Sequence, residues 1–448
     1  MNPNIFRKYD IRGIIGEDFT VDEAHALGRA MGTWLARREK TRIALGRDCR
    51  LTSPEVAGRL CDGLMESGCA VISIGVCPTP VLYFAIRHLE ADGGVMVTAS
   101  HNPPEYNGFK ICSGTESVFG EQIQEIRTMA ENRDFEDGQG SFVEAGVVPA
   151  YQDHLANSIR IDRPLRIAVD AGNGTGGPVA VPLFERLGCD VHQLHCEMDG
   201  RFPNHEPDPT VPDNMRELAE AVVDRELDLG IGFDGDADRI GVVDEKGNML
   251  YGDMLMILFA RDILKTSPGA TFLSEVKCSQ TMYDDIERHG GRAVMWKTGH
   301  SLIKRKMREE KAVLAGEMSG HMFFADRYFG YDDALYAGCR LLELMSRTRQ
   351  PLSSLLADVP RTYSTPEIRV DCPDDAKFGV VDRVAGHFRR THETIDIDGV
   401  RVLFDEGWGL VRASNTQPVL VLRFEAQSED RLAEIRSIVE DAVARART

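Results

Sequence analysis

Residues 42–75, RIALGRDCRLTSPEVAGRLCDGLMESGCAVISIG, contain the pattern that decides the fold. They read as an apolar strand, a polar loop, a helix around Val56 to Met65, a glycine and a second strand. The same order returns in residues 166–194, which begin RIAVDAGNGTGG, and more weakly in residues 270–296, which begin ATFLSEVKCS. Strands that alternate with helices at this spacing predict βαβ units. We therefore predict three related α/β domains with mixed, mostly parallel sheets and helices on both faces.

The end of the chain follows another plan. Pro360 and Pro366 punctuate a predicted linker, and the strand-like runs WGLV and VLVLRF follow it. A final helix is expected from about Glu429. Its apolar face holds Leu432, Ile435, Ile438 and Val439. This pattern predicts a smaller C-terminal α+β domain. The predicted domains are residues 1–146, 147–248, 249–360 and 361–448.

Composition excludes several classes of protein. The formal net charge of the 448 residues is −19, and a surface this acidic repels nucleic acid and anionic lipid. An anionic substrate would need positive charge concentrated locally. No stretch is apolar enough for a signal peptide or a membrane span, and the ten cysteines form no C-x-x-C pair. We expect a cytoplasmic protein with reduced thiols, a monomer or small homo-oligomer, that binds a small molecule and neither nucleic acid nor membrane.

The segment VMVTASHNPPEYNGFK, residues 95–110, sets an apolar strand before Ser100 and His101, with Lys110 downstream. Serine is a weak nucleophile until a base or a cation assists it, so these neighbours suit phosphoryl chemistry. Taken alone, a serine after a strand is an ordinary turn residue. We expect this loop to be exposed.

The segment LDLGIGFDGDADRIGVVD, residues 227–244, ends a strand in alternating aspartates. Because only glycine and alanine separate them, Asp234, Asp236 and Asp238 can converge on one hard cation such as Mg²⁺. An EF-hand begins with the same alternation, and Glu245 even stands at its twelfth position. Arg239 occupies the sixth position, where that loop requires glycine. Strands are also predicted on both sides, so Mg²⁺ is favoured over calcium and over a structural acidic loop.

The segment LAGEMSGHMFF, residues 314–324, places Glu317, Ser319 and His321 at alternate positions. In an extended loop the three side chains would share one side, where a carboxylate and a hydroxyl suit adjacent sugar hydroxyls. A common turn is the alternative.

The segment LVRASNTQPVLVLRF, residues 410–424, joins two predicted strands through a polar loop. Arginine offers a planar fork of donors that matches a phosphate, and hydroxyls and amides can supply the rest. A polar hairpin turn is the alternative. The candidate phosphate contacts are Arg412, Ser414, Asn415 and Thr416.

The run VDAGNGTGG supports a rival function. Gly172, Gly174 and Gly177 satisfy G-x-G-x-x-G after a strand, with Asp190 downstream, as in dinucleotide-binding folds. Asp190 falls at the start of the next predicted strand rather than at its end, where a ribose ligand is expected. We therefore assign the glycines to a tight strand-to-helix turn, with an NAD-dependent oxidoreductase as the alternative from another class.

These motifs, in this order, resemble the α-D-phosphohexomutase family. TASHNP with its downstream N-G-x-K is similar to the phosphoserine loop of that family, and FRKYDIRG, EVKCSQ, KTGHS and RYFGYDDALYA strengthen the resemblance across nearly the whole chain. Met318 within GEMSGH resembles the mannose/glucose branch, the phosphomannomutase/phosphoglucomutases, whereas glucosamine-phosphate mutases tend to have glutamine there. A phosphoglucosamine mutase of the same family stays an alternative.

The resemblance implies four domains around a central cleft and an enzyme that interconverts hexose 6-phosphate and hexose 1-phosphate. It implies Mg²⁺ as cofactor and a hexose 1,6-bisphosphate as intermediate and activator. The implied phosphoserine is Ser100, and the implied metal ligands are Ser100, Asp234, Asp236 and Asp238. The general acid/base stays open among Arg12, His101, Lys110 and His300. The implied substrate contacts are Tyr9, Arg239, Lys277, Glu317, Ser319, His321, Arg412, Ser414, Asn415 and Thr416. The preferred hexose and the pathway stay open.

Overall fold

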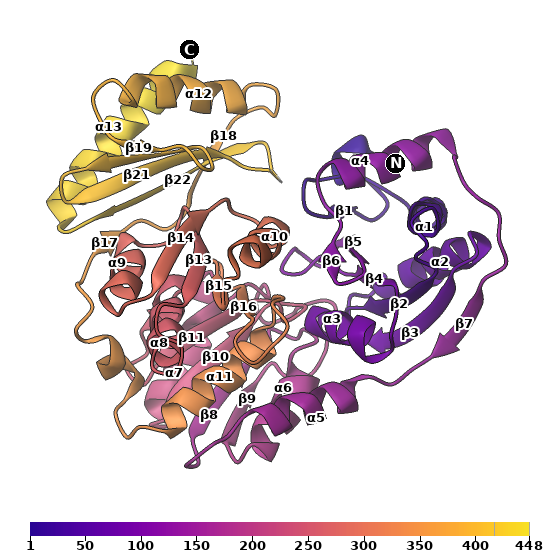
Figure 1. Cartoon of the computed structure of the whole chain (residues 1–448), viewed down its shortest axis with the longest axis horizontal. Helices are drawn as coiled ribbons and strands as arrows, with labels where there is room; N and C mark the ends of the chain where they lie inside the picture. Colours follow the sequence, from indigo (N-terminus) through magenta and orange to yellow (C-terminus); the bar gives the residue numbers. More distant parts are fainter. Residues whose placement is uncertain (416, 448) are drawn as a thin grey trace.

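The computed structural model describes residues 1–415 and 417–447, so the predicted phosphate contact Thr416 lies outside the described residues. Four sheets follow one another along the chain (Figure 1). The first three are mixed, with antiparallel strands at one edge and parallel strands from the middle to the other edge, and the fourth is antiparallel. The predicted fold class, three α/β units and a C-terminal α+β unit, is confirmed. The exact domain boundaries stay predictions.

The first sheet separates its helices by the alternation of its strand residues. Ile43 and Leu45 face the core formed with α1, α2 and α4, whereas Ala44 between them faces α3. The strands run in the order β1 (Ile11–Ile14), β5 (Tyr106–Ser113), β4 (Gly93–Val97), β2 (Arg42–Arg47), β3 (Ala70–Val76) and β7 (Ser141–Glu144), and β6 (Glu116–Ser117) pairs with β5. The helices are η1 (Pro3–Ile5), α1 (Val21–Ala36), α2 (Ser53–Glu66), α3 (Thr79–His88) and α4 (Glu121–Asn132).

The second sheet repeats this arrangement. Ile167 and Val169 face α6, and Ala168 faces α7. Its strand order is β12 (Met249–Leu250), β11 (Ile240–Asp244), β10 (Leu229–Phe233), β8 (Arg166–Asp170) and β9 (Asp190–Leu194). The helices are α5 (Val148–Ser158), α6 (Gly177–Arg186), η2 (Pro212–Met215) and α7 (Arg216–Asp224).

The third sheet packs α10 on one face and α8, α9 and α11 on the other. Leu273 contacts the α10 side, and its neighbour Phe272 contacts the opposite side. The strand order is β14 (Arg292–Trp296), β13 (Thr271–Glu275), β15 (Leu314–Gly316) and β16 (Met322–Phe324). The helices are α8 (Gly252–Leu264), α9 (Gln280–Arg288), α10 (His300–Glu310), α11 (Ala334–Ser346) and η3 (Leu352–Leu356).

The fourth sheet has helices on one face only. Its other face packs Trp408 and Leu410 against Val276 of the third unit. The strand order is β17 (Tyr363–Ser364), β22 (Val419–Ala426), β21 (Gly407–Ala413), β20 (Val400–Phe404) and β19 (Thr394–Ile395), and β18 (Ile368–Asp371) pairs with β22. The helices are α12 (Lys377–Phe388) and α13 (Glu429–Arg447).

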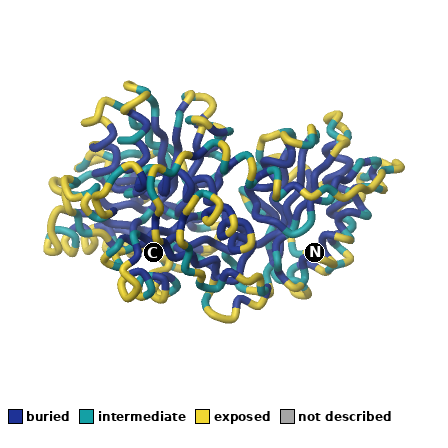
Figure 2. The backbone as a smooth tube through the Cα atoms, turned by 90° about the horizontal axis from the view of Figure 1, so that it is seen from below, coloured by how far each residue is buried: buried dark blue, intermediate teal, exposed yellow. Residues whose placement is uncertain are grey.

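The first three units share one hydrophobic core. It runs from α3 through α5, α6, α8 and α11, so these units are packed together rather than strung on linkers. Figure 2 shows the buried backbone inside the molecule and the exposed segments on its outer loops. Arg401, with no exposed surface, joins the fourth unit to the third by donating to the carbonyl oxygens of Val276 (2.8 Å) and Cys278 (2.9 Å).

Two expectations about the C-terminal unit are wrong. The segment between Pro360 and Pro366, predicted as a linker, supplies β17, because its backbone pairs with β22. Ile438 is exposed on α13 rather than in the apolar stripe, which Val439 and Val443 form instead.

All ten cysteines are free thiols. Among the described residues no helix has the length and hydrophobicity needed to cross a bilayer.

Candidate functional site

Ser100 lies in the turn that follows β4, in a left-handed conformation with φ of 51°. Its Oγ donates to Asp234 Oδ2 over 2.6 Å and lies 3.1 Å from His101 Nδ1. The guanidinium of the buried Arg50 holds the loop by donating to the carbonyl oxygens of Ser100 (2.9 Å) and Asn102 (2.6 Å). Ser100 is only 2% exposed, so the expectation of exposure is wrong for the serine itself, which the acidic loop of the second unit covers; Pro104 and Glu105 of the same loop are exposed.

The acidic loop follows β10 and brings Asp234, Asp236 and Asp238 together. One carboxylate oxygen from each lies within 4.8 Å of the others, and all three residues have no exposed surface. The turn depends on the small residues between them. A Cβ at Gly235 would stand 2.5 Å from the carbonyl oxygen of Ser100, so only glycine permits this contact between the two loops.

Lys110 on β5 neutralises part of this acidic cluster. Its Nζ donates to Asp236 Oδ2 over 2.7 Å and also contacts Asp238. Burial alone would lower the pKa of Lys110, but the carboxylates outweigh it and raise that pKa. Burial and the two neighbouring carboxylates raise the pKa of Asp234. For Asp236 burial works the same way, yet Lys110 outweighs it and lowers the pKa.

The carboxylates fit a cation. Oδ1 of Asp236 and Oδ1 of Asp238 are buried and have no hydrogen-bond partner among the described residues, although such atoms are costly to leave unpaired. A hard divalent cation accepts this kind of oxygen donor. The loop is not an EF-hand, because the antiparallel strands β10 and β11 flank it and the carboxylate of Glu245 is bound to Ser353 (2.5 Å).

Two stacked imidazoles lie beside the acidic loop. His321 Nε2 accepts from Arg239 Nε over 3.1 Å while its Nδ1 lies 3.1 Å from the carbonyl oxygen of Asp238, which fixes a neutral ring. Burial and Arg239 lower the pKa of His321. The ring of His300, at the start of α10, stacks on it with a centroid distance of 5.6 Å. The buried Asp332 Oδ2 lies 3.3 Å from His300 Nδ1, although the two atoms do not form a hydrogen bond.

The KTGHS run connects three units through Thr298. Its carbonyl oxygen accepts from Tyr9 Oη (2.8 Å), its amide donates to Asp398 (3.1 Å), and its hydroxyl donates to Glu275 (3.0 Å). The next residue, Gly299, has φ of 124°, and a Cβ there would meet the Tyr9 ring at 2.5 Å. Only glycine allows the first and third units to meet in this way.

Glu317 lies in a tight turn between β15 and β16, because its amide donates to the carbonyl oxygen of His321 over 2.9 Å. The predicted extended loop is therefore wrong, and Ser319 is half-buried at the tip. Glu317 Oε1 accepts from the amide of Gly299 (2.6 Å). Burial, followed by the charge of Glu275, raises the pKa of Glu317 to about 7. Lys277 Nζ donates to Glu367 Oε1 over 2.6 Å.

The Arg412 loop reaches back to the start of the chain. Arg412 Nε donates to Asp398 Oδ2 (3.0 Å), and Asn415 donates to Tyr9 Oη (2.9 Å) and accepts from Lys8 Nζ (3.3 Å). The hydroxyl of Ser414 accepts from the amide of Gln417 (3.1 Å). Hydrogen bonds thus lead from Ser100 to Asn415 through residues of all four units.

Arg12 on β1 extends the cationic side of the Ser100 loop. Its guanidinium donates to Asn102 Oδ1 (2.5 Å) and pairs with Asp10 (2.6 Å). Burial, then the charges of Arg239 and Arg12, lowers the pKa of His101. The ring beside Ser100 is therefore neutral near pH 7.

The glycine-rich turn after β8 is occupied by the protein itself. A Cβ at Gly174 would lie 2.6 Å from the carbonyl oxygen of Gly235, and one at Gly177 would lie 2.1 Å from that of Cys196. These glycines allow the turn to pack against the acidic loop and against Cys196, which follows β9. The geometry therefore supports a tight structural turn rather than a dinucleotide site.

Sequence reasoning missed the residues that support the site. Arg50 stands in the first repeat, and Asp332 and Asp398 stand in runs with no separate signal of their own. A charged residue directly after a buried strand, as in RDCR, is the one hint the sequence offered. The supporting residues not predicted are Lys8, Asp10, Asp48, Arg50, Thr79, Thr98, Glu275, Thr298, Asp332, Glu367 and Asp398.

Comparisons with known proteins agree with this geometry. The chain matches four families described as phosphoglucomutase/phosphomannomutase: alpha/beta/alpha domain I over residues 3–137, domain II over residues 149–247, domain III over residues 251–363, and the C-terminal domain over residues 367–442. A phosphomannomutase/phosphoglucomutase of Pseudomonas aeruginosa is 46% identical, with 97% of this chain and 94% of that protein covered.

Two further proteins extend the comparison. A phosphoglucomutase of Neisseria gonorrhoeae is 46% identical, with 97% of this chain and 95% of that protein covered. The crystal structure of a phosphoglucomutase/phosphomannomutase family protein from Burkholderia thailandensis superposes with a TM-score of 0.94 at 41% identity, covering 100% of this chain and 98% of that one. The chain therefore belongs to the phosphoglucomutase/phosphomannomutase family.

Proposed function

We propose that this chain is a cytoplasmic, magnesium-dependent phosphohexomutase that moves a phosphate between O6 and O1 of mannose or glucose through a phosphoserine at Ser100. The observation that carries the proposal is the 2.6 Å hydrogen bond between Ser100 Oγ and Asp234, inside a cluster of three buried aspartates with unpaired oxygens. A serine used only to stabilise a turn would not need this surrounding charge.

The first transfer moves the phosphoryl group of phosphorylated Ser100 to a hexose 1-phosphate. The bond between Ser100 Oγ and phosphorus breaks as the sugar O6 forms a bond to the same phosphorus, and the O6 hydroxyl gives up its proton. The resulting hexose 1,6-bisphosphate then rotates within the site, so that its 1-phosphate faces Ser100. The reverse step returns that phosphate to Ser100 and leaves hexose 6-phosphate. Lys110 and Arg12 are positioned to stabilise charge on the transferring oxygens.

The geometry narrows the candidates for the proton acceptor. Lys110 stays protonated because of its carboxylate partners, and arginine does not deprotonate in proteins. His101, held neutral beside Ser100, is the group we propose for the carrier side. His300, which lies beside Asp332 and stacks on His321, is the alternative.

The proposed cation is Mg²⁺, held by Ser100 together with Asp234, Asp236 and Asp238. When bound, it supplies charge stabilisation for the phosphoryl oxygens. All the proposed ligand atoms are oxygens, and two of them are buried without a hydrogen-bond partner among the described residues. These ligands favour Mg²⁺ over a softer metal.

The proposed substrate contacts divide into two groups. Glu317 and Ser319 hold the sugar hydroxyls, and Arg412 leads the loop that receives the phosphate that is not reacting. The contacts between Tyr9, Asn415 and Thr298 support a single binding region built from the first, third and fourth units. The remaining proposed contacts are Arg239, Lys277, His321, Ser414 and Thr416. The partner is a small phosphosugar, and the protein acts as a monomer or small homo-oligomer.

Sugar choice tests the proposal. The bisphosphate must bind in two orientations, so the groups that grip the ring must contact O3 and O4, which lie near the exchange axis. Recognition then depends little on C2, where glucose and mannose differ. We expect mannose 1-phosphate and glucose 1-phosphate to give kcat/KM values within about 100-fold, or about 2.7 kcal/mol.

The experiment is a coupled steady-state assay on the two sugar phosphates and on glucosamine 1-phosphate, with glucose 1,6-bisphosphate as activator. A ratio beyond about 10⁴ between mannose and glucose would mean that C2 is read by a dedicated hydrogen bond. A clear preference for glucosamine 1-phosphate would favour the other branch of the family. No turnover of any of the three would overturn the proposal.

A further inference from the structure

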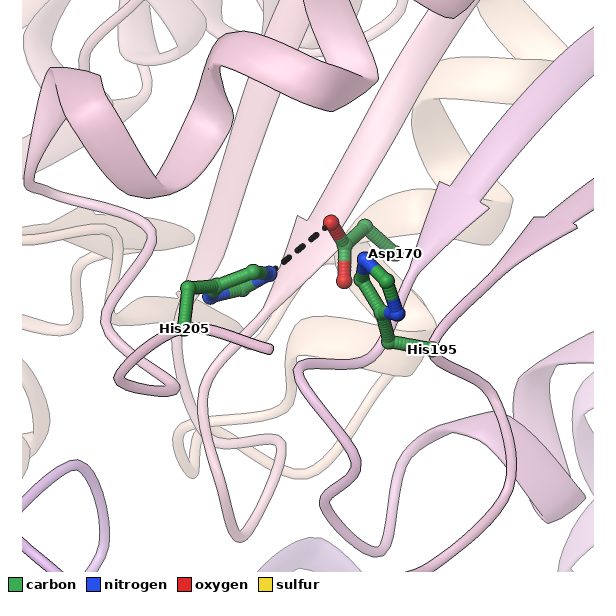
Figure 3. Close-up of side chains that lie close together, drawn as sticks. All are labelled: Asp170, His195 and His205. Atoms are coloured by element: carbon green, nitrogen blue, oxygen red, sulfur yellow. Dashed lines mark hydrogen bonds and ion pairs between the residues drawn. The ribbon is translucent and has the colours of Figure 1, made fainter. Parts of the chain in front are cut away.

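A second group of metal-ligating side chains lies outside the site described above. Asp170 is the last residue of β8, His195 follows β9 directly, and His205 stands in the next loop (Figure 3). One ligand atom from each lies within 4.8 Å of the other two. We propose that these three residues form a binding site for a divalent transition metal, best suited to Zn²⁺, that fixes the loop behind the acidic cluster.

The ring of His205 is oriented as a ligand. Its Nδ1 lies 2.8 Å from the carbonyl oxygen of Glu206, so Nδ1 carries a proton and donates it. In the neutral ring Nε2 then offers a lone pair, and it lies 3.1 Å from Asp170 Oδ2. Two acceptors face each other at that distance only when a proton or a cation lies between them. A backbone carbonyl on the far nitrogen is the usual support of a metal-bound histidine.

Asp170 also has a ligand atom available for a metal. It is only 2% exposed, and its Oδ1 is already held by the amide of Gly172 over 2.8 Å, which leaves Oδ2 for the site. Within residues 1–415 and 417–447, no lysine or arginine forms an ion pair with Asp170, whose ionic contact is His205. A buried carboxylate without a permanent cation partner is expensive unless a metal or a protonated ring neutralises it.

His195 completes the set. Its φ of 47° lies in the left-handed region, which few residues other than glycine adopt, and turns the chain sharply after β9. Its Nε2 lies 2.9 Å from Glu217 Oε2, at the start of α7. The Glu217 side chain is 57% exposed and therefore hydrated, so the buried charge that a cation would offset is that of Asp170.

Ligand chemistry separates this group from the acidic cluster. Imidazole with carboxylate suits Zn²⁺ and similar metals, whereas oxygen donors alone suit Mg²⁺. The two sites should therefore respond differently to the two ions.

The location gives the metal a structural role. The loop after His195 is tied to the turn after β8, because Asn204 donates to Asn173 (2.7 Å) and Asn173 donates to the carbonyl oxygen of Glu197 (2.9 Å). Pro207 in the same loop packs against Gly235, the residue between Asp234 and Asp236. A metal at His195 and His205 would hold this wall of the Ser100 site in place.

The test is a Zn²⁺ titration of the full-length, chelator-treated protein by calorimetry, in excess Mg²⁺. Zn²⁺ also competes for the acidic cluster, so the decisive quantity is the difference between wild type and His195→Gln. We expect the variant to lose about one equivalent, or to bind it at least about tenfold more weakly. His192→Gln, on β9 but outside the group, is the matched control and should bind as wild type does.

A second variant and a spectroscopic signal test the same site independently. His205→Gln should lose the same equivalent, and Co²⁺ should give a visible absorption band in wild type and in His192→Gln but not in His195→Gln. Because His195 is partly exposed, its variant decides the matter if His205→Gln does not fold. Equal Zn²⁺ stoichiometry and affinity in wild type and His195→Gln would overturn the proposal and leave a protonated His205 paired with Asp170.

Discussion

The Ser100 loop and the Arg412 loop contact their neighbouring units in different ways. Around Ser100, buried charges bind one another within the first and second units: Lys110 contacts two aspartates, and Arg50 grips the loop backbone. The Arg412 loop meets the first unit through Asn415, by hydrogen bonds to Tyr9 and Lys8 at partly exposed positions. The first arrangement is rigid, whereas the second can be made and broken at low cost.

This difference suggests a division of labour. A preorganised set of charges stabilises a transition state, and a loop joined by a few hydrogen bonds can close on a substrate and release it. We therefore expect substitutions near Ser100 to lower kcat and substitutions near Arg412 to raise KM.

The largest effect is expected from Ser100→Ala, which removes the proposed phosphoryl carrier. Activity should fall by about 10⁴-fold or more, because within residues 1–415 and 417–447 no other hydroxyl hydrogen-bonds Asp234. The melting temperature should change little, since alanine keeps the backbone held by Arg50. Ser113→Ala on β5 is the control. Near-normal turnover by Ser100→Ala in a coupled assay would sink the mechanism.

The next effect concerns the acidic cluster. Asp236→Asn removes a charge while keeping an acceptor for Thr79, so the fold should persist and the cation should bind more weakly. We expect kcat to fall by about 100-fold or more. Chelator should abolish wild-type activity and Mg²⁺ should restore it. Asp190→Asn, an exposed aspartate of the same unit, should behave as wild type, and full activity in chelator would rule out the metal.

The Arg412 end should respond differently. Arg412→Ala removes a contact that we place on the phosphate that is not reacting, where binding is similar in the ground and transition states. KM should rise by about 10-fold to 100-fold with kcat within a few-fold of wild type. Arg412→Lys, which keeps the charge but loses the fork, should be intermediate. A large loss of kcat at unchanged KM would show that the two loops do not divide the work.

The smallest effect is on stability. Folding raises the pKa of Glu317 from 4.5 to about 7, so this carboxyl contributes stability below pH 4.5 that is lost as pH rises through 7. Glu317→Gln imitates the protonated form. The melting temperature of the variant should match that of wild type near about pH 5 and exceed it by several degrees near about pH 8. The corresponding gain in the free energy of unfolding is up to about 3 kcal/mol. Glu309→Gln, on the exposed side of α10, should show no such trend, and parallel curves would contradict the shift.

The two loops also show which features of the structure could be predicted from the sequence. The alternation of strands and helices predicted the units, and the local runs around Ser100 and Asp234 predicted which side chains would meet. Those signals are short-range. The grip of Arg50 on Ser100 joins residues 50 positions apart, and Thr298 meets Tyr9 from 289 positions away. No periodicity or motif encodes such pairs.

Burial was harder still to predict. The Ser100 loop is polar and turn-like, so it was expected at the surface, yet the acidic loop of another unit covers Ser100 itself through the Gly235 contact. Similarly, the alternation of Glu317, Ser319 and His321 suggested an extended loop, whereas a backbone hydrogen bond closes a turn there. The first error arose because packing between units decides burial, and the second because side-chain alternation does not reveal a turn closed by the backbone.

The central claim is that Ser100 carries the phosphate. The most direct measurement is the intact mass of the full-length protein after incubation with glucose 1,6-bisphosphate and Mg²⁺, followed by mapping of the modified peptide. The account predicts the added mass of one phosphoryl group on Ser100, which is lost on incubation with glucose 1-phosphate and is absent from Ser100→Ala. An active protein without phosphate, or with phosphate on another residue, would contradict it.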